Sequence, residues 1–501
     1  MSTGYITVIT GKFITDSPLL ISDGRSDGSI DKFIQRDGSG AIFLPGSSIA
    51  GALLQTAARI CPDLFSNSEK FNQITMKTNG KSPEDNSKDK FRNSRWKISS
   101  CYPENKNIEP WIRQGVSIIQ KSSTKKEHAL YNFEFIPPGT VFPFEFEVDT
   151  GNFHNPDSHN SAKLARDLLL LSLREWQNGY GFLGGQVSRG LGRITPAEIK
   201  VFDIPASDVM HWPDTGKTIE EASNGKDWIC KDWKSNLKSD FNNSWHRIKI
   251  NISITAGKTE WGWDSIAVAS GDWEKLRFDI NDKPDTNTRW KFAGTGQDYT
   301  YFVTSSDEDD ESKSNLPDHL LPTDGKGSVI IPGSSIRGIL RHMLSAIERS
   351  SRVNIEDPAV SEFSCRDDNH IKKLREDLPD DIARLFGFNE HDGHLLIPDA
   401  VSSDVESALF QNHAEDEFTA GSFGSALFNR EVIMSGRFST DIIIEAPDSD
   451  ELIKYANLFE KLNVLSKNNL LPLGGGTARG HGWPSWKFTV SQSTHFGEVT
   501  R

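Results

Sequence analysis

The sequence predicts an α+β protein that consists of two tandem copies of one ferredoxin-like domain. Three pairs of similar segments recur along the chain in the same order, which predicts a duplication. Within each half, hydrophobic patterns follow the order strand, helix, strands, helix, strand, which is typical of the ferredoxin-like unit. The length of 501 residues is sufficient for two such domains with a hydrophobic core in each.

Three segments of the first half have a counterpart in the second half. The first pair shares the run Pro-Gly-Ser-Ser-Ile, the second begins with Ala-Leu, and the third begins with Leu-Gly-Gly. In chain order the pairs are 31–60 with 318–347, 129–142 with 426–439, and 183–192 with 473–482. Because all three pairs have nearly the same separation, a tandem duplication is the simplest explanation.

The duplication defines the expected domain organisation. We expect copy 1 at 1–205, a linker at 206–246 and copy 2 at 247–501. Two stretches have no counterpart in the other copy. We expect the polar, charged stretch 66–95 to be disordered and 256–316 to be an insertion in copy 2.

Each copy begins with a strand and a helix. The strands alternate apolar and polar residues at 6–14 and 248–254. Short strands at 41–44 and 328–331 then end at a proline, and we expect Ser47 or Ser334 to cap the helix that follows. The apolar stripes of these helices have helical spacing: Ile49, Leu53, Ala57 and Ile60 in copy 1, and Ile336, Leu340, Leu344 and Ile347 in copy 2.

The rest of each copy contains strands and a second helix. Strands are expected notably over 133–148. The second helix of copy 1 carries Leu164, Leu168 and Leu171, and its counterpart spans about 450–465. The glycine-rich segment follows this helix directly in both copies.

Composition favours a soluble, cytoplasmic protein. Apolar residues make up 36% and charged residues 25% of the chain, and no apolar run is long enough to span a membrane. We also expect no signal peptide. The net charge of −14 argues mildly against a nucleic-acid binder, although a basic groove can coexist with an acidic exterior. The cysteines form no Cys-x-x-Cys pair, so we expect free thiols at Cys61, Cys101, Cys230 and Cys365.

The glycine-rich segments are the first candidate binding sites. Glycine lets backbone N–H groups approach a phosphate, and arginine binds phosphate through two hydrogen bonds. A plain glycine-rich turn explains the pattern equally well, and it matches neither a dinucleotide fingerprint nor a Walker A loop. The candidates are Gly184, Gly185, Ser188, Arg189, Gly190, Gly192 and Arg193 in copy 1, and Gly474, Gly475, Gly476, Arg479, Gly480 and Gly482 in copy 2.

Two further groups of residues are candidates for phosphate contacts. The helix N-terminus after Pro-Gly-Ser-Ser is a natural phosphate site that is also compatible with plain capping. A polar excursion between Ile119 and Ala129 predicts an exposed basic hairpin tip, which is either a solvated turn or a contact to a nucleic-acid backbone. These candidates are Ser47, Ser48, Ser334, Ser335, Arg337, Lys121, Lys125 and Lys126.

Two aspartates are the candidates for chemistry. Asp31 and Asp318 each lie 14 residues before the proline of Pro-Gly-Ser-Ser, in loops without a strong pattern. An exposed carboxylate near a phosphodiester can recruit Mg²⁺ or Mn²⁺ and stabilise charge during cleavage. A surface aspartate without a function is the alternative, and Asp23 and Asp27 in the same loop of copy 1 are competitors.

Together these segments resemble the RAMP superfamily of CRISPR-Cas proteins, and most of all the backbone subunit of type III effector complexes. The resemblance rests on LPGSSIAGAL and IPGSSIRGIL, on LGGQVSRGLGRI, on RQGVSII with HALYNFEFIPPGTVF, and on LFGFNEHDGHLLIPDAV. It covers nearly all of both halves apart from the linker and the insertions. Two copies in one chain are similar to the double backbone subunits of subtype III-D.

The resemblance implies an RRM-like core that assembles along a guide RNA. It also implies a thumb that interrupts the guide–target duplex, and a loop aspartate that cleaves complementary target RNA with a divalent metal. Asp31 matches that catalytic and metal-binding position, Asp318 takes it by repeat alignment, and 119–128 matches the thumb. The implied partners are guide RNA, target RNA, a large subunit, other RAMP subunits and a small subunit, without a membrane.

Copy 2 departs from the family pattern. It has Ala478 in place of Ser188 and Trp483 in place of Arg193, and its thumb segment 414–418 is acidic. These differences imply weaker RNA binding in copy 2 or an inactive Asp318.

Three alternatives remain open. In the first alternative the chain is a non-catalytic guide-RNA scaffold. In the second it is an endoribonuclease that processes guide precursors, and in the third it is a cytosolic enzyme that binds a small phosphorylated ligand. Substitution of the two aspartates separates the first alternative from target cleavage, because guide binding should survive in both cases.

Overall fold

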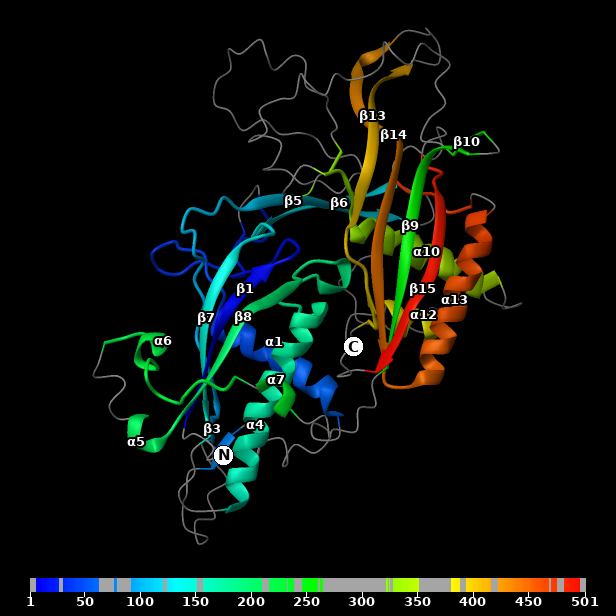
Figure 1. The fold of residues 1–501 in the computed structure, drawn as a ribbon. Coiled ribbons are helices and arrows are strands. Elements are labelled where there is room, and N and C mark those ends of the chain that lie inside the picture. The colour runs from blue at the N-terminus through cyan, green and yellow to red at the C-terminus, as the bar shows by residue number, and fades with distance from the viewer. Residues whose placement is uncertain are drawn as a thin grey trace, which may run out of the picture.

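The computed structural model shows the two halves of the chain as two adjacent domains (Figure 1). The structure describes residues 6–26, 30–62, 76–78, 92–119, 124–150, 156–209, 216–231, 233–237, 246–259, 262–264, 321–322, 324, 328–350, 380–387, 393–415, 422–467, 470–474 and 482–495.

Copy 1 contains a four-stranded antiparallel sheet in the order of a ferredoxin-like domain. From edge to edge the strands are β4 (Trp96–Ile98), β7 (Val141–Asp149), β1 (Ile6–Thr15) and β8 (Ile194–Ile204). Ile9 on the central strand β1 is opposite Phe146 on one side and Val201 on the other. Helices α1 (Gly46–Ile60) and α4 (Pro156–Glu175) cover one face of the sheet. The predicted α+β class is therefore confirmed.

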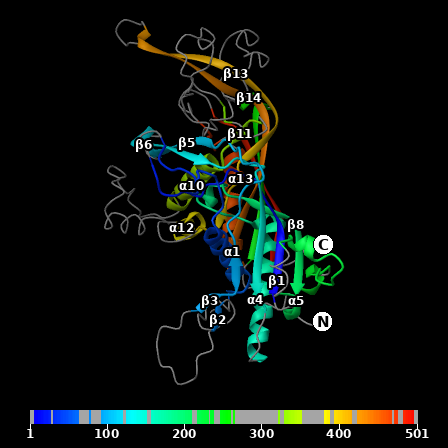
Figure 2. The ribbon, with the colours of Figure 1, turned by 90° about the vertical axis from the view of Figure 1, so that its left-hand side faces the viewer.

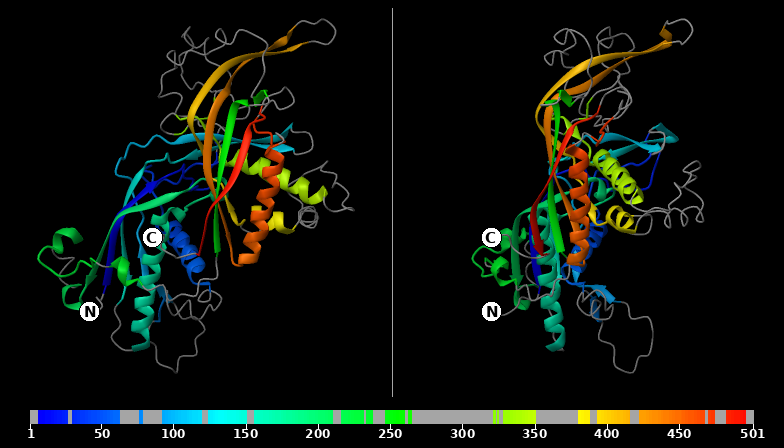
Figure 3. Two further views of the ribbon diagram at one scale, coloured as in Figure 1. Left: turned by 45° about the vertical axis from the view of Figure 1, so that its right-hand side comes forward. Right: turned by 90° about the vertical axis from the view of Figure 1, so that its right-hand side faces the viewer.

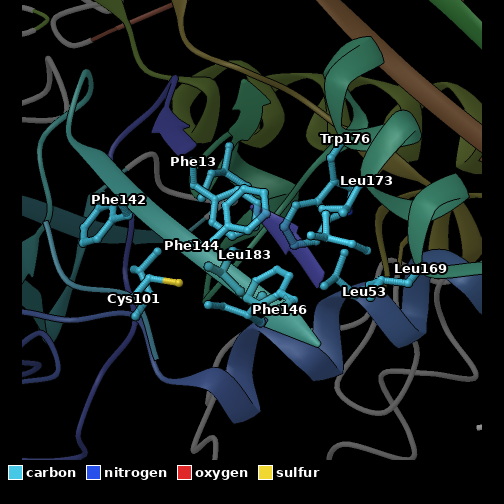
Figure 4. Packing of buried hydrophobic residues seen from close by; sticks show 14 of the residues in the cluster. Phe13, Leu53, Cys101, Phe142, Phe144, Phe146, Leu169, Leu173, Trp176 and Leu183 are labelled. Atoms are coloured by element: carbon cyan, nitrogen blue, oxygen red, sulfur yellow. The ribbon is translucent and has the colours of Figure 1, made fainter. Parts of the chain in front are cut away.

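Aromatic side chains fill the core between the sheet and helices of copy 1 (Figure 4). The rings of Phe13 and Phe144 stack with centroids 4.3 Å apart. Trp176, in the π-helical turn η1 (Trp176–Tyr180), is fully buried, and its Nε1 donates a 2.9 Å hydrogen bond to Thr56 on α1. This bond satisfies the indole N–H and joins the two helices. The predicted stripe of α1 is buried at Ile49, Leu53, Ala57 and Ile60.

Copy 2 repeats the strand order of copy 1. Its corresponding strands are β15 (Ser485–His495), β9 (His246–Thr259), β14 (Ser422–Ala446) and β12 (Leu395–Leu396). The sheet is extended by β10 (Gly262–Asp264), β13 (Ala400–Glu415) and β11 (Ile330–Ile331). Figure 3 shows the helices on one face of this sheet: α10 (Gly333–Ser350), α12 (Asp380–Phe386) and α13 (Ser449–Lys467). Both copies therefore have the same layered arrangement.

Each copy carries a hairpin between its second and third core strands, which we call the thumb hairpin. In copy 1 it consists of β5 (Trp111–Ile119) and β6 (Thr124–Phe135), and in copy 2 of β13 with the first half of β14. Figure 2 shows the β13–β14 hairpin reaching well beyond its sheet.

The two thumb hairpins differ where they join their sheets. In copy 1 the run Ile-Pro-Pro-Gly at 136–139 separates β6 from β7, because proline has no N–H to donate to a neighbouring strand. The corresponding run Ile-Met-Ser-Gly at 433–436 lies inside the single strand β14. The thumb hairpin of copy 2 is therefore continuous with its sheet, and that of copy 1 is set off by a turn.

The segment predicted as a linker folds against copy 1. It contains the short helices α5 (Ala206–Val209), α6 (Ile219–Ala222) and α7 (Trp233–Asn236). Ile219 and Trp228 are buried against Val8 of β1 and residues of β8. Because side chains alternate along a strand, Val8 lies on the face opposite the Ile9 core. The linker therefore covers part of the sheet face that α1 and α4 leave open.

The two predicted insertions are described only in part. Within 66–95, which we expected to be disordered, β2 (Met76–Thr78) pairs with β3 (Arg92–Ser94). Within 256–316, the structure describes the end of β9 and the strand β10, which pair with each other. The remaining residues of both insertions lie outside the described part of the chain.

Candidate functional site

Asp31 lies at the foot of the copy 1 thumb hairpin. Its side chain is exposed, and its Oδ2 accepts a 2.8 Å hydrogen bond from the backbone N–H of Asn132 on β6. The N–H of Asp31 in turn donates to the carbonyl oxygen of Asn132 at 2.9 Å. These two bonds hold the carboxylate beside the thumb strand while its second oxygen, Oδ1, receives no hydrogen bond from the described residues.

A buried glutamate on the same thumb strand holds the loop that follows Asp31. Glu134 Oε2 accepts the N–H of Ile34 at 3.0 Å, and the two Glu134 oxygens bind the Arg36 guanidinium at 2.9 and 2.6 Å. The hydrogen bond that Arg36 donates to Glu134 raises the pKa of Arg36, although burial opposes the shift. A bidentate pair of this kind restricts orientation as well as distance. The sequence analysis missed Glu134, although an identical residue occupies position 431 in the aligned segment of copy 2.

The other aspartate candidates have different outcomes. Asp23 accepts hydrogen bonds from the Arg25 backbone at 2.8 Å and from its side chain at 2.6 Å. Burial opposes ionisation of Asp23, but these bonds outweigh it and lower the pKa of the carboxyl. Asp23 is thus engaged in a local turn. Asp27 and Asp318 lie outside the described residues.

The predicted basic hairpin tip corresponds to the end of the copy 1 thumb hairpin. In its backbone register Ile118 is opposite Lys125, and Ile119 is opposite Thr124. Lys125 and Lys126 therefore lie next to the turn, whereas Lys121 is outside the described residues. The expected hairpin is present, and the contact of these lysines with RNA stays a prediction.

Packing between protein segments requires the glycines of the copy 1 glycine-rich loop. Gly184, Gly190 and Gly192 have φ values of +85°, +83° and +77°. A Cβ atom on Gly184 would lie 2.2 Å from the Leu20 carbonyl oxygen, and one on Gly190 would lie 2.4 Å from that of Ile397. Such approaches exclude a side chain. The glycine-rich loop therefore packs on two other segments. Gly184 contacts Leu20, at the start of the loop that contains Asp31, and Gly190 contacts Ile397 of copy 2.

Arginines gather where this loop meets copy 2. Arg337 on α10 donates to the backbone oxygen of Ser188 at 3.2 Å and also to those of Leu395 and Phe386. Burial, together with the charges of Arg341 and Arg189, lowers the pKa of Arg337 to about 10. The charges of Arg341 and Arg189 thus disfavour the charged form of Arg337, and an anion bound nearby would favour it. Of the corresponding copy 2 loop, Gly474 and Gly482 are described, and Gly475, Gly476, Arg479 and Gly480 lie outside the described residues.

Side chains that follow the strands β4 and β12, rather than the predicted serines, bind the first N–H groups of the two Pro-Gly-Ser-Ser helices. Pro45 occupies the N-cap position of α1, with no hydrogen bond from its side chain, so the prediction that Ser47 caps this helix is wrong. Instead, Ser100 Oγ accepts the Gly46 N–H at 3.1 Å, and Asp399 Oδ1 accepts the Gly333 N–H at 2.8 Å. The first-turn serines lie one or two residues further along each helix: Ser47, Ser48, Ser334 and Ser335.

Asp399 also binds the thumb hairpin of copy 1. Its Oδ2 accepts a 2.8 Å hydrogen bond from Arg113 on β5, and both side chains are largely buried. One carboxylate thus caps α10 of copy 2 and fixes the base of the copy 1 thumb hairpin. The sequence analysis noted the run LIPDAV but assigned no role to its aspartate.

A second set of buried charges lies at the joint between the copies. Arg247 on β9 pairs with Glu445 at 2.6 Å and with Glu175 of copy 1 at 3.4 Å. Its guanidinium also lies 3.2 Å from the centre of the Tyr180 ring. Arg59 of α1 approaches Glu445 from the other side at 3.2 Å.

A polar cleft of about 310 Å³ opens beside this joint. Arg193 from copy 1 faces Lys249, Asn251 and Asp441 from the sheet of copy 2 across it. Lys249 and Asn251 both bond to Asp441 at 2.8 Å. Arg193 therefore lies in a cleft between the copies, four residues after Arg189 in the same loop.

Asp31 fits a divalent ion that is shared with a substrate. Among the described residues no three His, Cys, Asp or Glu side chains gather as a metal-binding group. Mg²⁺ commonly uses one or two carboxylates and completes its coordination with water and substrate phosphate. Oδ1 of Asp31 is a suitable single ligand of that kind.

These observations define a protein of two ferredoxin-like domains, each with a thumb hairpin. A family model for the RAMP superfamily matches residues 12–195 and 266–485, and the chain belongs to that superfamily. Its members are generally CRISPR-associated RNA-binding proteins that work in RNA–protein complexes. The two matched regions are consistent with two copies of the domain. No curated protein matches the chain. In the described residues, no helix is long and apolar enough to cross a membrane.

Proposed function

We propose that this chain is a backbone subunit of a type III CRISPR effector complex, which binds guide RNA and cleaves complementary target RNA. The observation that carries the proposal is the position of Asp31. Its exposed carboxylate is held at the foot of a thumb hairpin by Asn132, with one oxygen available to a ligand. The resemblance described above assigns target cleavage to a carboxylate at this position.

The arginines at the joint support binding of an RNA backbone. Arg337 and Arg341 are largely buried, and burial lowers the pKa of both. A phosphate at this site would stabilise their charged forms and compensate for their desolvation. Because phosphates carry no sequence information, contacts of this kind suit a guide of any sequence.

Cleavage of RNA requires little of the protein beyond alignment and charge stabilisation. The substrate's own 2′-oxygen attacks the adjacent phosphorus, the bond from phosphorus to the 5′-oxygen breaks, and a 2′,3′-cyclic phosphate and a 5′-hydroxyl result. Asp31 would hold Mg²⁺ or Mn²⁺ through Oδ1, and the ion would supply charge stabilisation at the phosphodiester. The thumb hairpin would position the target strand beside this carboxylate.

The experiment is cleavage of a labelled target RNA by the complex assembled on a matching guide. Asp31→Asn, Asp318→Asn and the double variant are compared with wild type in Mg²⁺ on a sequencing gel. Asp37→Asn is the matched control, because Asp37 lies in the same loop and its carboxylate binds Ser39 and Ala41 of its own turn and Tyr102. Guide and target binding are measured in parallel.

We expect each single variant to lose cleavage at one position, and the double variant at both, with RNA binding retained. An unchanged set of products in Asp31→Asn would overturn the proposed role of Asp31. Loss of guide-precursor processing instead of target cleavage would favour the processing alternative, and binding of a free nucleotide but not of RNA would favour the small-ligand alternative.

A further inference from the structure

The two copies share a feature that lies outside the aspartate loops themselves. In copy 1 the buried Glu134 accepts the N–H of Ile34, three residues after Asp31. In copy 2 the buried Glu431 accepts the N–H of Leu321, three residues after Asp318, also at 3.0 Å. Glu134 and Glu431 occupy the same position of the aligned segments ALYNFEF and ALFNREV. The same bond is therefore present in both halves of the duplication.

Both glutamates are buried, so their carboxylates need partners inside the protein. Glu134 and Glu431 are 6% and 8% exposed, and a carboxylate removed from water must be compensated by hydrogen bonds or charge. In copy 1 the compensation comes from Ile34 and from both terminal nitrogens of Arg36. In copy 2 Glu431 also accepts a 3.0 Å hydrogen bond from Ser407 on β13. Glu134 and Glu431 therefore differ in their other partners, but each accepts a backbone N–H from the loop that follows the aspartate.

The contact fixes the loop relative to the thumb hairpin. Glu134 lies on β6, two residues after Asn132, which binds Asp31. The Glu134 N–H also donates to the Lys32 carbonyl oxygen at 2.9 Å. Residues 31–34 are therefore held along β6 at three successive points, and at the last of these the Glu134 side chain holds the Ile34 N–H.

We propose that Glu134 is the positioning residue for Asp31, and that Glu431 has the same role for Asp318. The inference rests on the proposed cleavage function. Glu134 does not touch the substrate. It keeps the aspartate loop in register with the thumb hairpin, so that the carboxylate stays where the hairpin presents the target strand.

The test compares Glu134→Ala and Glu134→Gln in the assembled complex, with saturating target RNA in single turnover. Glutamine can still accept the Ile34 N–H but loses the charge that binds Arg36. Glu147→Ala is the matched control, because Glu147 lies on β7, the next strand along the chain, in a pair with Lys97 whose side chains are 33% and 60% exposed respectively. Hydrogen exchange of the Ile34 amide reports on the loop without using activity.

We expect Glu134→Ala to slow cleavage at the copy 1 position by about 10- to 100-fold, with guide and target binding unchanged. The Ile34 amide should exchange faster, and Glu134→Gln should recover much of the rate. Cleavage at the copy 2 position should be unaffected, and Glu431→Ala should give the reverse pattern.

The outcomes distinguish the two proposals. If Asp31→Asn leaves cleavage intact, the proposed function fails, and the exchange measurement still tests whether Glu134 holds the loop. If Asp31→Asn abolishes cleavage at its position but both Glu134 variants cleave at the wild-type rate, only the positioning role is overturned. If Glu134→Ala does not assemble on guide RNA, Glu134→Gln and the Glu431 pair decide the question.

Discussion

Gly184 and Gly474 occupy equivalent positions in the two glycine-rich loops and have almost the same backbone conformation, with φ of +85° and +86°. Their surroundings differ. A Cβ atom on Gly184 would lie 2.2 Å from the Leu20 oxygen, whereas no atom of the described residues would lie within 4 Å of one on Gly474. Both positions therefore favour glycine because of the backbone conformation, but only at position 184 does a neighbouring atom also leave no room for a side chain.

We expect Gly184→Ala to destabilise the protein more than Gly474→Ala. Both substitutions incur the cost of a left-handed conformation, about 1–2 kcal/mol. Only Gly184→Ala also forces the loop away from Leu20, which should add at least about 1 kcal/mol. Urea denaturation of each variant measures the difference, and equal losses would mean that the Leu20 contact does not restrict this position.

The residue scale also shows what the sequence could indicate. The repeat alone singled out Asp31, because both copies have an aspartate at the same distance from Pro-Gly-Ser-Ser. The repeat also contained Glu134 and Glu431, but a glutamate in a strand pattern looks like any surface residue. Its burial depends on the loop that folds over it, and no local pattern records that contact.

At the scale of the elements, strands and helices agree closely with the predictions. The alternating pattern at 6–14 corresponds to β1, and the helix expected at about 450–465 is α13 at Ser449–Lys467. The helix caps were not predictable in this way. Ser47 has the preferred residue type shortly after a proline, yet the cap comes from Ser100, 54 residues after the Gly46 whose N–H it accepts. Tertiary structure supplies a partner that sequence neighbours cannot indicate.

We expect substitutions of the two capping residues, Ser100 and Asp399, to lower the free energy of unfolding by different amounts. Ser100→Ala should cost about 1 kcal/mol, the usual value of a lost helix cap. Asp399→Ala should cost more, about 3–5 kcal/mol, because it also leaves the largely buried Arg113 without its carboxylate. Asp399→Asn should fall between them, since the amide oxygen can still accept the Gly333 N–H. Unfolding free energies of the three variants provide the check, and an order in which Asp399→Asn equals Asp399→Ala would assign the whole effect to the charge.

At the scale of the whole molecule, the joint between the copies was outside the reach of sequence analysis. The duplication indicated two domains but not how they pack. The charged residues at this joint come from distant parts of the chain and show no shared motif: Arg59, Glu175, Arg247 and Glu445. Burial opposes ionisation of Glu445, but Arg247 and Arg59 outweigh it and lower the pKa of this carboxyl.

We expect Glu445→Gln to loosen this joint. Two arginines would lose their shared carboxylate in a buried site, a loss of about 3–5 kcal/mol. Glu147→Gln is the control, because its pair with Lys97 is largely exposed and should contribute less than about 1 kcal/mol. Scanning calorimetry should resolve two transitions in Glu445→Gln, one for each copy. A single unchanged transition would show that other contacts hold the copies together.

The position of the linker segment affects how a second copy of this chain could pack against copy 1. Copy 2 presents the outer face of its sheet, at Arg247 and Lys249, to copy 1. On copy 1 the start of β1 on the corresponding face is already covered by Ile219 and Trp228 of the linker. A second chain that approached copy 1 in the same manner would meet these side chains first. We therefore expect that a second copy of this chain does not add to copy 1 through that face in the way that copy 2 does.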